Sequence, residues 1–151
     1  MRKISRLKLN PVRYSSMVGE SWHHFSFKVK YAHPIFDIKP VREECHKLLL
    51  EAFERNKIRY EEIGFDNNHV HGLMDIGNYS RPEAAKLVKG YVARKLFKRF
   101  PSIKQSFFWG SGLWNPASWI DSVGKDKEFM KSYVRKQRYY AGHQSKLEDF
   151  V

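Results

Sequence analysis

Residues 58–76 read IRYEEIGFDNNHVHGLMDI, and this stretch predicts a β-hairpin. Its two halves, 58–65 and 69–76, carry the apolar and alternating pattern of half-buried strands. The turn between them is the DNN of residues 66–68, and Asp and Asn side chains bond to nearby backbone and tolerate left-handed φ. The two strands are therefore expected to pair as antiparallel neighbours.

The second strand of this hairpin has two different faces. Side chains two residues apart on a strand leave the same side, so Val70, Met74 and Ile76 share one face. His69 and His71 share the other, about 6.5 Å apart along the strand. The apolar face suits burial under helices, and the histidine face is expected to be an open surface.

Apolar patterns on both sides of the hairpin complete a domain. A strand over 22–31 and a helix over 40–56 precede it, and a helix over 80–100, opened by a capping-box pattern, follows it. At least one more strand is expected within 107–120, and a last helix over 126–140. The order strand, helix, strand, strand, helix, strand predicts an α+β, ferredoxin-like (RRM-like) fold, with an antiparallel sheet, two helices on one face and the other face free.

Length and composition indicate one folded domain. The chain has 151 residues, of which 42% are hydrophobic, enough for one core. Residues 1–21 form a basic N-terminal arm, 22–140 the folded domain and 141–151 a C-terminal tail. The single cysteine, Cys45, lies on the apolar stripe of the helix over 40–56 and is expected to be buried. Without a membrane-length apolar run or a signal-peptide pattern, a cytoplasmic protein is expected, with no membrane partner.

The charge of the chain favours a polyanionic partner. Lys and Arg total 28 against 16 acidic residues, which gives a formal charge of +12 and a pI near 9.8. Such a balance favours nucleic acid through counterion release and electrostatic steering. Aromatic residues make up 15% of the chain and offer surfaces on which unpaired bases can stack.

Chemistry is expected where the paired histidines meet a downstream tyrosine. Tyr133 and Gln137 are four residues apart in the predicted last helix, so they would share a helical face. With His69 and His71 they would supply two imidazole nitrogens, an amide oxygen and a phenol, the parts of a metal-assisted nucleophile. Mixed nitrogen and oxygen ligands with open positions suit Mg²⁺ or Mn²⁺, although zinc or nickel could also occupy the histidines.

Taken alone, each of these residues has a plainer interpretation. Tyr133 shares a helical stripe with Met130 and Val134, as a core aromatic would. His69 and His71 could equally be polar residues on an open strand face. Only the combination of these residues favours a catalytic site.

The two histidines, the tyrosine and the glutamine stand in this order on a small basic frame. Together they resemble the single-tyrosine HUH transposases of small bacterial and archaeal insertion sequences. Three more stretches agree in order and spacing: 24–31 resembles the first strand of that family, 87–94 its second helix and 114–124 its tryptophan segment. The resemblance runs from about Trp22 to Gln137.

The resemblance implies an activity and a substrate. Such an enzyme nicks and rejoins single-stranded DNA with hairpin ends, and Tyr133 would form a covalent 5′-phosphotyrosine. His69, His71 and Gln137 would hold the divalent metal, Mg²⁺ or Mn²⁺. The family often works as a homodimer with composite active sites, in which the tyrosine helix docks on the partner subunit, and the same is expected here.

The same resemblance and the positive charge suggest the residues that contact DNA. The expected DNA-binding residues are Lys30, Lys86, Lys89, Arg94 and Trp114. Exposed members of the tryptophans 109, 114 and 119 would stack on bases, and the cations would contact phosphates. A solvated basic helix face is an equally good interpretation of the cations on the helix over 80–100.

Other polar residues near the histidines are expected to play lesser roles. His23 and His24 are adjacent, so they must point to opposite faces, and neither is expected to bind the metal directly. Asp75 is expected to lie on the surface or to support a ligand. Asn68 stands where the family often has an aspartate before the histidines.

Two other functions also fit parts of the pattern. An HUH replication initiator or relaxase would nick DNA by the same chemistry, but the chain has no room for a helicase or primase segment. A non-catalytic ferredoxin-like nucleic-acid-binding module would only stack bases on its sheet, and the chain lacks an RNP-type aromatic signature.

Overall fold

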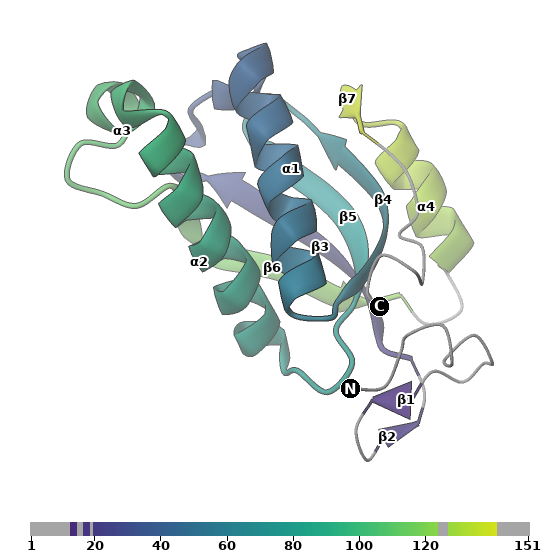
Figure 1. Cartoon of the computed structure of the whole chain (residues 1–151). Coiled ribbons are helices and arrows are strands. Elements are labelled where there is room, and N and C mark those ends of the chain that lie inside the picture. The colour runs from purple at the N-terminus through teal and green to yellow at the C-terminus, as the bar shows by residue number, and fades with distance from the viewer. Residues whose placement is uncertain (1–12, 15–16, 19, 124–126, 142–151) are drawn as a thin grey trace.

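The computed structural model describes residues 13–14, 17–18, 20–123 and 127–141 (Figure 1). The main strands are β3 (Trp22–Val29), β4 (Arg59–Phe65), β5 (His69–Asp75), β6 (Trp114–Ser122) and β7 (Tyr139–Tyr140). The helices are α1 (Lys39–Arg55), α2 (Arg81–Arg99), α3 (Pro101–Phe107) and α4 (Lys127–Arg135). A separate two-stranded pair, β1 (Arg13–Tyr14) and β2 (Met17–Val18), precedes them. Most of the predicted arm and tail lies outside the described residues.

The sheet confirms the ferredoxin-like prediction. Its order is β6-β3-β5-β4-β7, and every pair is antiparallel. The hairpin forms as predicted, with β4 and β5 joined over residues 66–68. The short strand β7 is an addition, because it pairs with the outer edge of β4 at Gly64 and Phe65.

One face of the sheet carries the main core. Helices α1 and α2 lie side by side over this face (Figure 1). Phe25, Phe27 and Val70 of the sheet are fully buried there, together with Phe53 and Cys45 of α1. Helix α2 begins with the predicted capping box, in which Ser80 and Glu83 satisfy each other's backbone amides. Burial also raises the pKa of the Cys45 thiol, which fits an inert core residue.

The other face of the sheet is not free, and here the prediction was wrong. Helix α4 packs on it against β4 and β5. Leu73, Val123 and Val134 are buried without belonging to the main core. A short amphipathic helix that follows β6 thus gives this face a cover of its own, since α4 must bury its apolar side somewhere.

One predicted boundary was also wrong. The last helix was expected over 126–140 but ends at Arg135, because the chain beyond it turns to pair as β7 with β4. The sequence also did not predict the short helix α3, which Pro101 opens because proline suits the first helical turn. The strand predicted within 107–120 is therefore confined to β6, and its start at 114 follows the glycine-containing loop.

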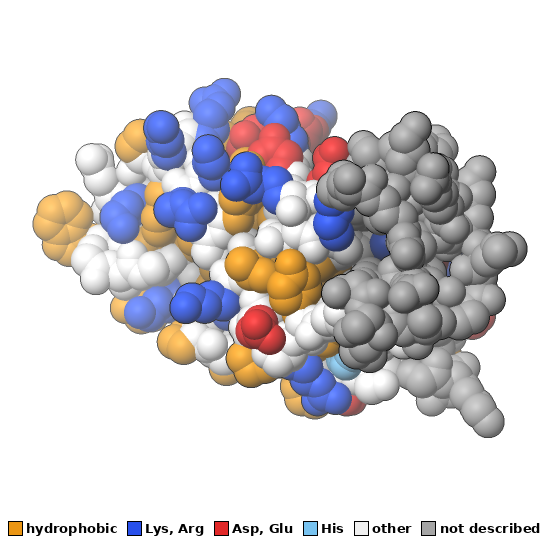
Figure 2. Space-filling model, turned by 60° about the horizontal axis from the view of Figure 1, so that its bottom comes forward, with side chains coloured by type: hydrophobic (Ala, Val, Ile, Leu, Met, Phe, Trp, Pro, Cys, Tyr) orange, Lys and Arg blue, Asp and Glu red, His pale blue; other side chains and the backbone are white. Residues whose placement is uncertain are grey.

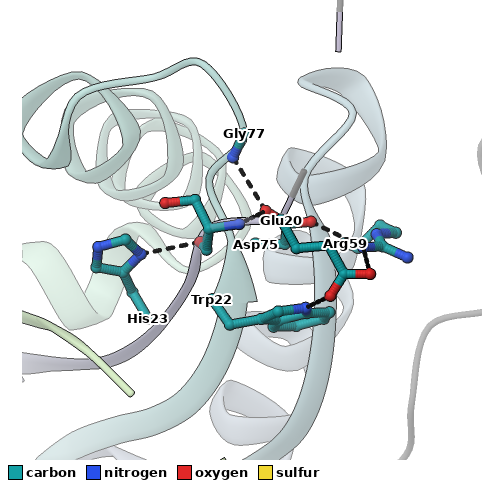
Figure 3. A network of polar contacts seen from close by, with 7 residues as sticks. Glu20, Trp22, His23, Arg59, Asp75 and Gly77 are labelled. Carbon is teal, nitrogen blue, oxygen red and sulfur yellow. Dashed lines mark hydrogen bonds and ion pairs between the residues drawn. The ribbon is translucent and has the colours of Figure 1, made fainter. Parts of the chain in front are cut away.

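Asp75 lies at the end of β5 and holds the start of β3 to the neighbouring strands (Figure 3). It is fully buried, and its carboxylate accepts hydrogen bonds from the backbone of Ser21 at 2.8 Å and of Gly77 at 3.2 Å. Arg59 forms an ion pair with it at 2.9 Å and a second one with Glu20 at 3.2 Å. Asp75 is therefore a structural residue away from the histidine pair.

Replacing Asp75 by Ala should lower the free energy of unfolding by about 3–5 kcal/mol, because it removes the buried partner of Arg59 and the acceptor of two backbone hydrogen bonds. The measurement is denaturant unfolding followed by tryptophan fluorescence. Glu43→Ala is the control, since it removes only the exposed 3.7 Å pair with Lys39. Equal losses in both variants would contradict this role for Asp75.

Candidate active site

Three histidines from two neighbouring strands lie together on the face covered by α4. His69 and His71 come from β5, and their ring centroids are 4.4 Å apart. His24 comes from β3, and its Nε2 lies 3.2 Å from Nδ1 of His71. His71 and His24 are both buried, at 7% exposure each. The sequence predicted the histidine pair but not the third member.

The alternation of side chains along 24–27 is the sequence signal that could have placed His24 with the histidine pair. Phe25 and Phe27 point into the main core, so His24 must point to the opposite face, which is that of the histidine pair. The register of β3 against β5 was not readable from the sequence. It pairs Ser26 with His71 and brings His24 one step along the same face.

The surroundings keep these imidazoles neutral. Burial, together with the neighbouring His69 and His24, lowers the pKa of His71 to about 3. Burial also lowers the pKa values of His69 and His24, against the opposing effects of Asp66 and Asp121. Neutral imidazole is the form that binds a metal ion.

Tyr133 lies beside these histidines. Its ring centroid is 5.7 Å from that of His71 and 5.9 Å from that of His24, and both contacts are edge-on. The side chain remains 45% exposed, so it is not a core aromatic. The adjacent Val134 fills that packing role, because it is fully buried. In this structure the tyrosine thus reaches histidines of its own chain, and its expected docking on a partner subunit remains a prediction.

Gln137 reaches the same face by a different route from the one predicted. It lies in the turn after α4, where its backbone N–H donates to the Val134 carbonyl at 3.0 Å. Its side chain lies over Gly64, which is paired directly with His71. A Cβ on Gly64 would come within 2.8 Å of the Val134 oxygen and 2.9 Å of the Gln137 Cβ. The missing side chain at 64 therefore lets the end of α4 approach the histidines.

Two adjacent carboxylates attach α4 to β4. Glu61 pairs with Lys131 at 3.0 Å, and Glu62 pairs with Arg135 at 2.6 Å and accepts a hydrogen bond from the Tyr140 hydroxyl. Both glutamates are buried, and Glu62 has a left-handed φ of 54° at an irregularity in the β4–β5 register. This bulge allows consecutive side chains to meet the same helix.

A cavity of about 630 Å³ opens beside the tyrosine. Its wall combines the buried histidines with aromatic side chains of β6 and α4. It is lined by His24, Ser26, His71, Trp119, Asp121, Ser122, Val123, Phe129, Met130 and Tyr133. Trp119 and Phe129 are largely exposed at its rim. The cavity thus offers stacking surfaces next to a phenol and imidazoles.

Comparison with known proteins identifies the family of this chain. A family model described as "Transposase IS200 like" matches residues 17–137. The chain belongs to the IS200-like transposase family. This family assignment favours a transposase over the replication initiator and the simple binding module that the sequence left open.

Individual relatives agree with this assignment. The transposase is 26% identical to the ISDra2 transposase TnpA of Deinococcus radiodurans over 117 residues, which cover 76% of this chain and 82% of that protein. A crystal structure of a candidate transposase from Deinococcus radiodurans R1 has the same fold, with a TM-score of 0.66, 24% identity and coverage of 84% and 98%. The structure of a REP-associated tyrosine transposase bound to a REP hairpin superposes with a TM-score of 0.55, 11% identity and coverage of 81% and 69%.

The cations predicted to bind DNA lie away from the histidines of the transposase. Lys86 and Arg94 are exposed on α2, which covers the opposite face of the sheet. The Lys89 ammonium donates to the Asn115 carbonyl at 2.9 Å and to Ser118 at 2.7 Å, so it joins α2 to β6. Figure 2 shows Lys and Arg side chains spread widely over one face of the molecule, with hydrophobic side chains between them.

Two other residues expected at the DNA lie near β6. Trp114 is only 8% exposed and packs on Phe27 and Phe36, while its indole N–H donates to the Lys89 carbonyl at 3.1 Å. It therefore cannot stack on a base without leaving the core. Lys30 is half-buried directly after β3, and its ammonium lies 5.5 Å from the centre of the Tyr31 ring.

The donor set suits a divalent metal. No group of three or more His, Cys, Asp or Glu side chains in the described part of the transposase is arranged to hold one. The predicted set differs from such a group, since its third member is the Gln137 amide. Each imidazole of that set has a hydrogen-bond partner at Nδ1 within the described residues, an arrangement that metal-binding histidines commonly show. None of the helices within the described ranges is long and apolar enough to cross a membrane.

Gly64→Ala should destabilise the transposase by about 1–3 kcal/mol, because the new Cβ collides with backbone at the end of α4. The same variant should speed hydrogen exchange in residues 127–135. Gly112→Ala is the matched control, since a Cβ there meets no atom within 4 Å. Unchanged exchange in α4 of Gly64→Ala would contradict the close contact.

The attachment of α4 should weaken in acid. Burial alone would raise the pKa of Glu62, but the hydrogen bonds from Arg135 and Tyr140 outweigh it and lower the pKa below the usual glutamate value. The stabilisation by Glu62 is therefore complete above that usual value and is lost as the pH falls through the lower folded pKa. Unfolding free energies measured from pH 7 down to pH 3 should fall more steeply for the wild type than for Glu62→Gln. Parallel curves would show that Glu62 does not carry this effect.

Proposed function

We propose that this transposase cleaves and rejoins single-stranded DNA through a covalent bond between Tyr133 and the 5′ phosphate of the cut strand. One observation carries the proposal: the half-exposed Tyr133 lies beside two buried, neutral histidines at the edge of an open cavity. Among the described residues, this is where a tyrosine hydroxyl, free imidazole nitrogens and exposed aromatic rings meet.

The proposed step exchanges one phosphodiester for another. The Tyr133 Oη–P bond forms, the P–O3′ bond of the DNA breaks, and the proton that the phenol loses balances the proton that the leaving 3′ oxygen gains to become a hydroxyl. Attack by the released or another 3′-OH reverses the exchange and frees Tyr133. Because the number of phosphoester bonds is unchanged, the strand can rejoin without ATP.

A divalent ion, Mg²⁺ or Mn²⁺, would be held by His69, His71 and the Gln137 oxygen. When bound, such an ion neutralises charge on the scissile phosphate and polarises it. The chain itself contributes the rest. The low pKa of His71 keeps its imidazole neutral, and the Glu62–Arg135 pair holds α4 so that Tyr133 faces the histidines.

The cavity supports single-stranded rather than duplex DNA at the reacting bond. Trp119 and Phe129 expose ring faces next to Tyr133, and paired bases would not be free to stack on them. The REP-associated relative was solved with a hairpin, so hairpin ends beside the cleaved strand are a reasonable substrate. A homodimer is part of the same proposal, with each Tyr133 beside the histidines of its own chain, as in this structure.

The test uses labelled single-stranded oligonucleotides taken from the DNA that flanks the gene. With Mn²⁺, the wild type should form a protein–DNA adduct that survives denaturing electrophoresis, and EDTA should abolish it. Tyr133→Phe should form none, and His71→Ala should lower the yield by about 10²-fold or more, in the range of lost metal catalysis. Tyr139→Phe is the matched control, because its hydroxyl bonds to Asp37. An adduct that persists in Tyr133→Phe would exclude this nucleophile.

A further inference from the structure

Both predicted metal ligands are hydrogen-bonded to residues outside the predicted ligand set. His69 Nδ1 lies 2.7 Å from the Asn68 side-chain oxygen, and His71 Nδ1 lies 3.2 Å from His24 Nε2. A neutral imidazole carries one proton on one of its two nitrogens. The partner at Nδ1 therefore decides whether Nε2 keeps a lone pair for a metal ion.

The tautomer of His69 follows from its hydrogen bond to Asn68. An amide oxygen can only accept a hydrogen bond, so the proton of His69 lies on Nδ1 and its Nε2 is free. Asn68 is thus the hydrogen-bond acceptor that fixes this tautomer.

The tautomer of His71 is harder to assign, because its hydrogen-bond partner is another imidazole, which can donate or accept. If His24 Nε2 accepts, His71 is protonated on Nδ1 and its Nε2 can bind a metal. If His24 Nε2 donates, His71 carries its proton on Nε2 and cannot. Asp121 favours the first arrangement: it pairs with His24 from β6, on the side of β3 away from His71 on β5, so its negative charge draws the His24 proton away from the nitrogen that faces His71.

We propose that His24 is a positioning residue, which holds His71 in the tautomer whose Nε2 is free for the metal ion. This inference rests on the proposed function, since it assumes that His71 is a metal ligand. His24 itself needs no contact with the metal or with the DNA. Its hydrogen bond orients the ring that makes that contact.

The packing around His24 restricts the orientation of its ring. Its ring is nearly parallel to that of His71, with centroids 5.3 Å apart and 12° between planes, and Tyr133 closes the cluster edge-on. Both imidazoles are buried in strands at the centre of the sheet, so neither can turn toward solvent. Packing therefore favours a single geometry of the buried pair.

Metal affinity gives the first test. Titration of Mn²⁺ into the DNA-free protein, followed by electron paramagnetic resonance, should show a 10–100-fold weaker Kd for His24→Leu than for the wild type. His24→Gln, whose side-chain oxygen can accept the same hydrogen bond, should stay within a few-fold of wild type. His23→Leu is the matched control: His23 is equally buried on the same strand but bonds to the Ser21 carbonyl.

A second test needs no metal. Long-range ¹H–¹⁵N NMR of the metal-free protein should show His71 protonated on Nδ1 in the wild type and in His24→Gln. In His24→Leu it should show loss of that preference, while thermal unfolding confirms that the variant is folded. A merely structural role for His24 would change stability without changing the tautomer.

The outcomes separate the two proposals. An Nε2-protonated His71 in the wild type, an unchanged Kd in His24→Leu, or a His24→Gln as weak as His24→Leu would each overturn the positioning role. If instead the wild type formed no Tyr133 adduct and bound no Mn²⁺, the proposed function would fail. The NMR result would still decide whether His24 fixes the His71 tautomer.

Discussion

The contact between the end of α4 and Gly64 of β4 is the constraint on which the candidate site depends. At this point the Val134 carbonyl and the Gln137 side chain lie where a Cβ would otherwise be. Two ion pairs, from Glu61 and Glu62 to the helix, hold the same contact from the side. They offset the strain of a left-handed residue at 62, which costs on the order of 1–3 kcal/mol. Without this docking of α4 on β4, Tyr133 would not lie beside the histidines, and the candidate site would not form.

The two faces of the sheet have separate tasks. The face under α1 and α2 holds nearly all the large buried side chains and provides stability. The face under α4 holds buried polar groups, which are costly unless each has a partner. The histidines find theirs in β3 and in the hairpin turn, His24 for His71 and Asn68 for His69, and Glu61 and Glu62 find theirs in α4. The rigidity of the first face thus supports the chemistry expected on the second.

Sequence patterns predicted local elements well and their ends less well. The hairpin, the capping box at Ser80 and the apolar stripe of α1 depend on short-range rules, and each formed as expected. The last helix is shorter than predicted. Residues 139–140 form backbone hydrogen bonds with the edge of β4 as β7, in place of those that a longer helix would have formed. Trp114 and Lys89 were expected at the DNA, yet the core and the α2–β6 junction hold them, as only packing could reveal.

The sequence by itself determined the fold class, the pairing of His69 with His71, and the family to which Tyr133 and Gln137 belong. These depend on alternation, turn chemistry and the order of residues, which are properties of the chain. Only the tertiary structure decided that α4 covers the histidine face, that Gly64 admits Gln137, and that His24 completes the cluster. The reason is physical: strand register and helix docking bring together residues that are 47 positions apart in the case of His24 and His71. Such contacts are set by the packing of whole elements, which no short stretch of sequence specifies.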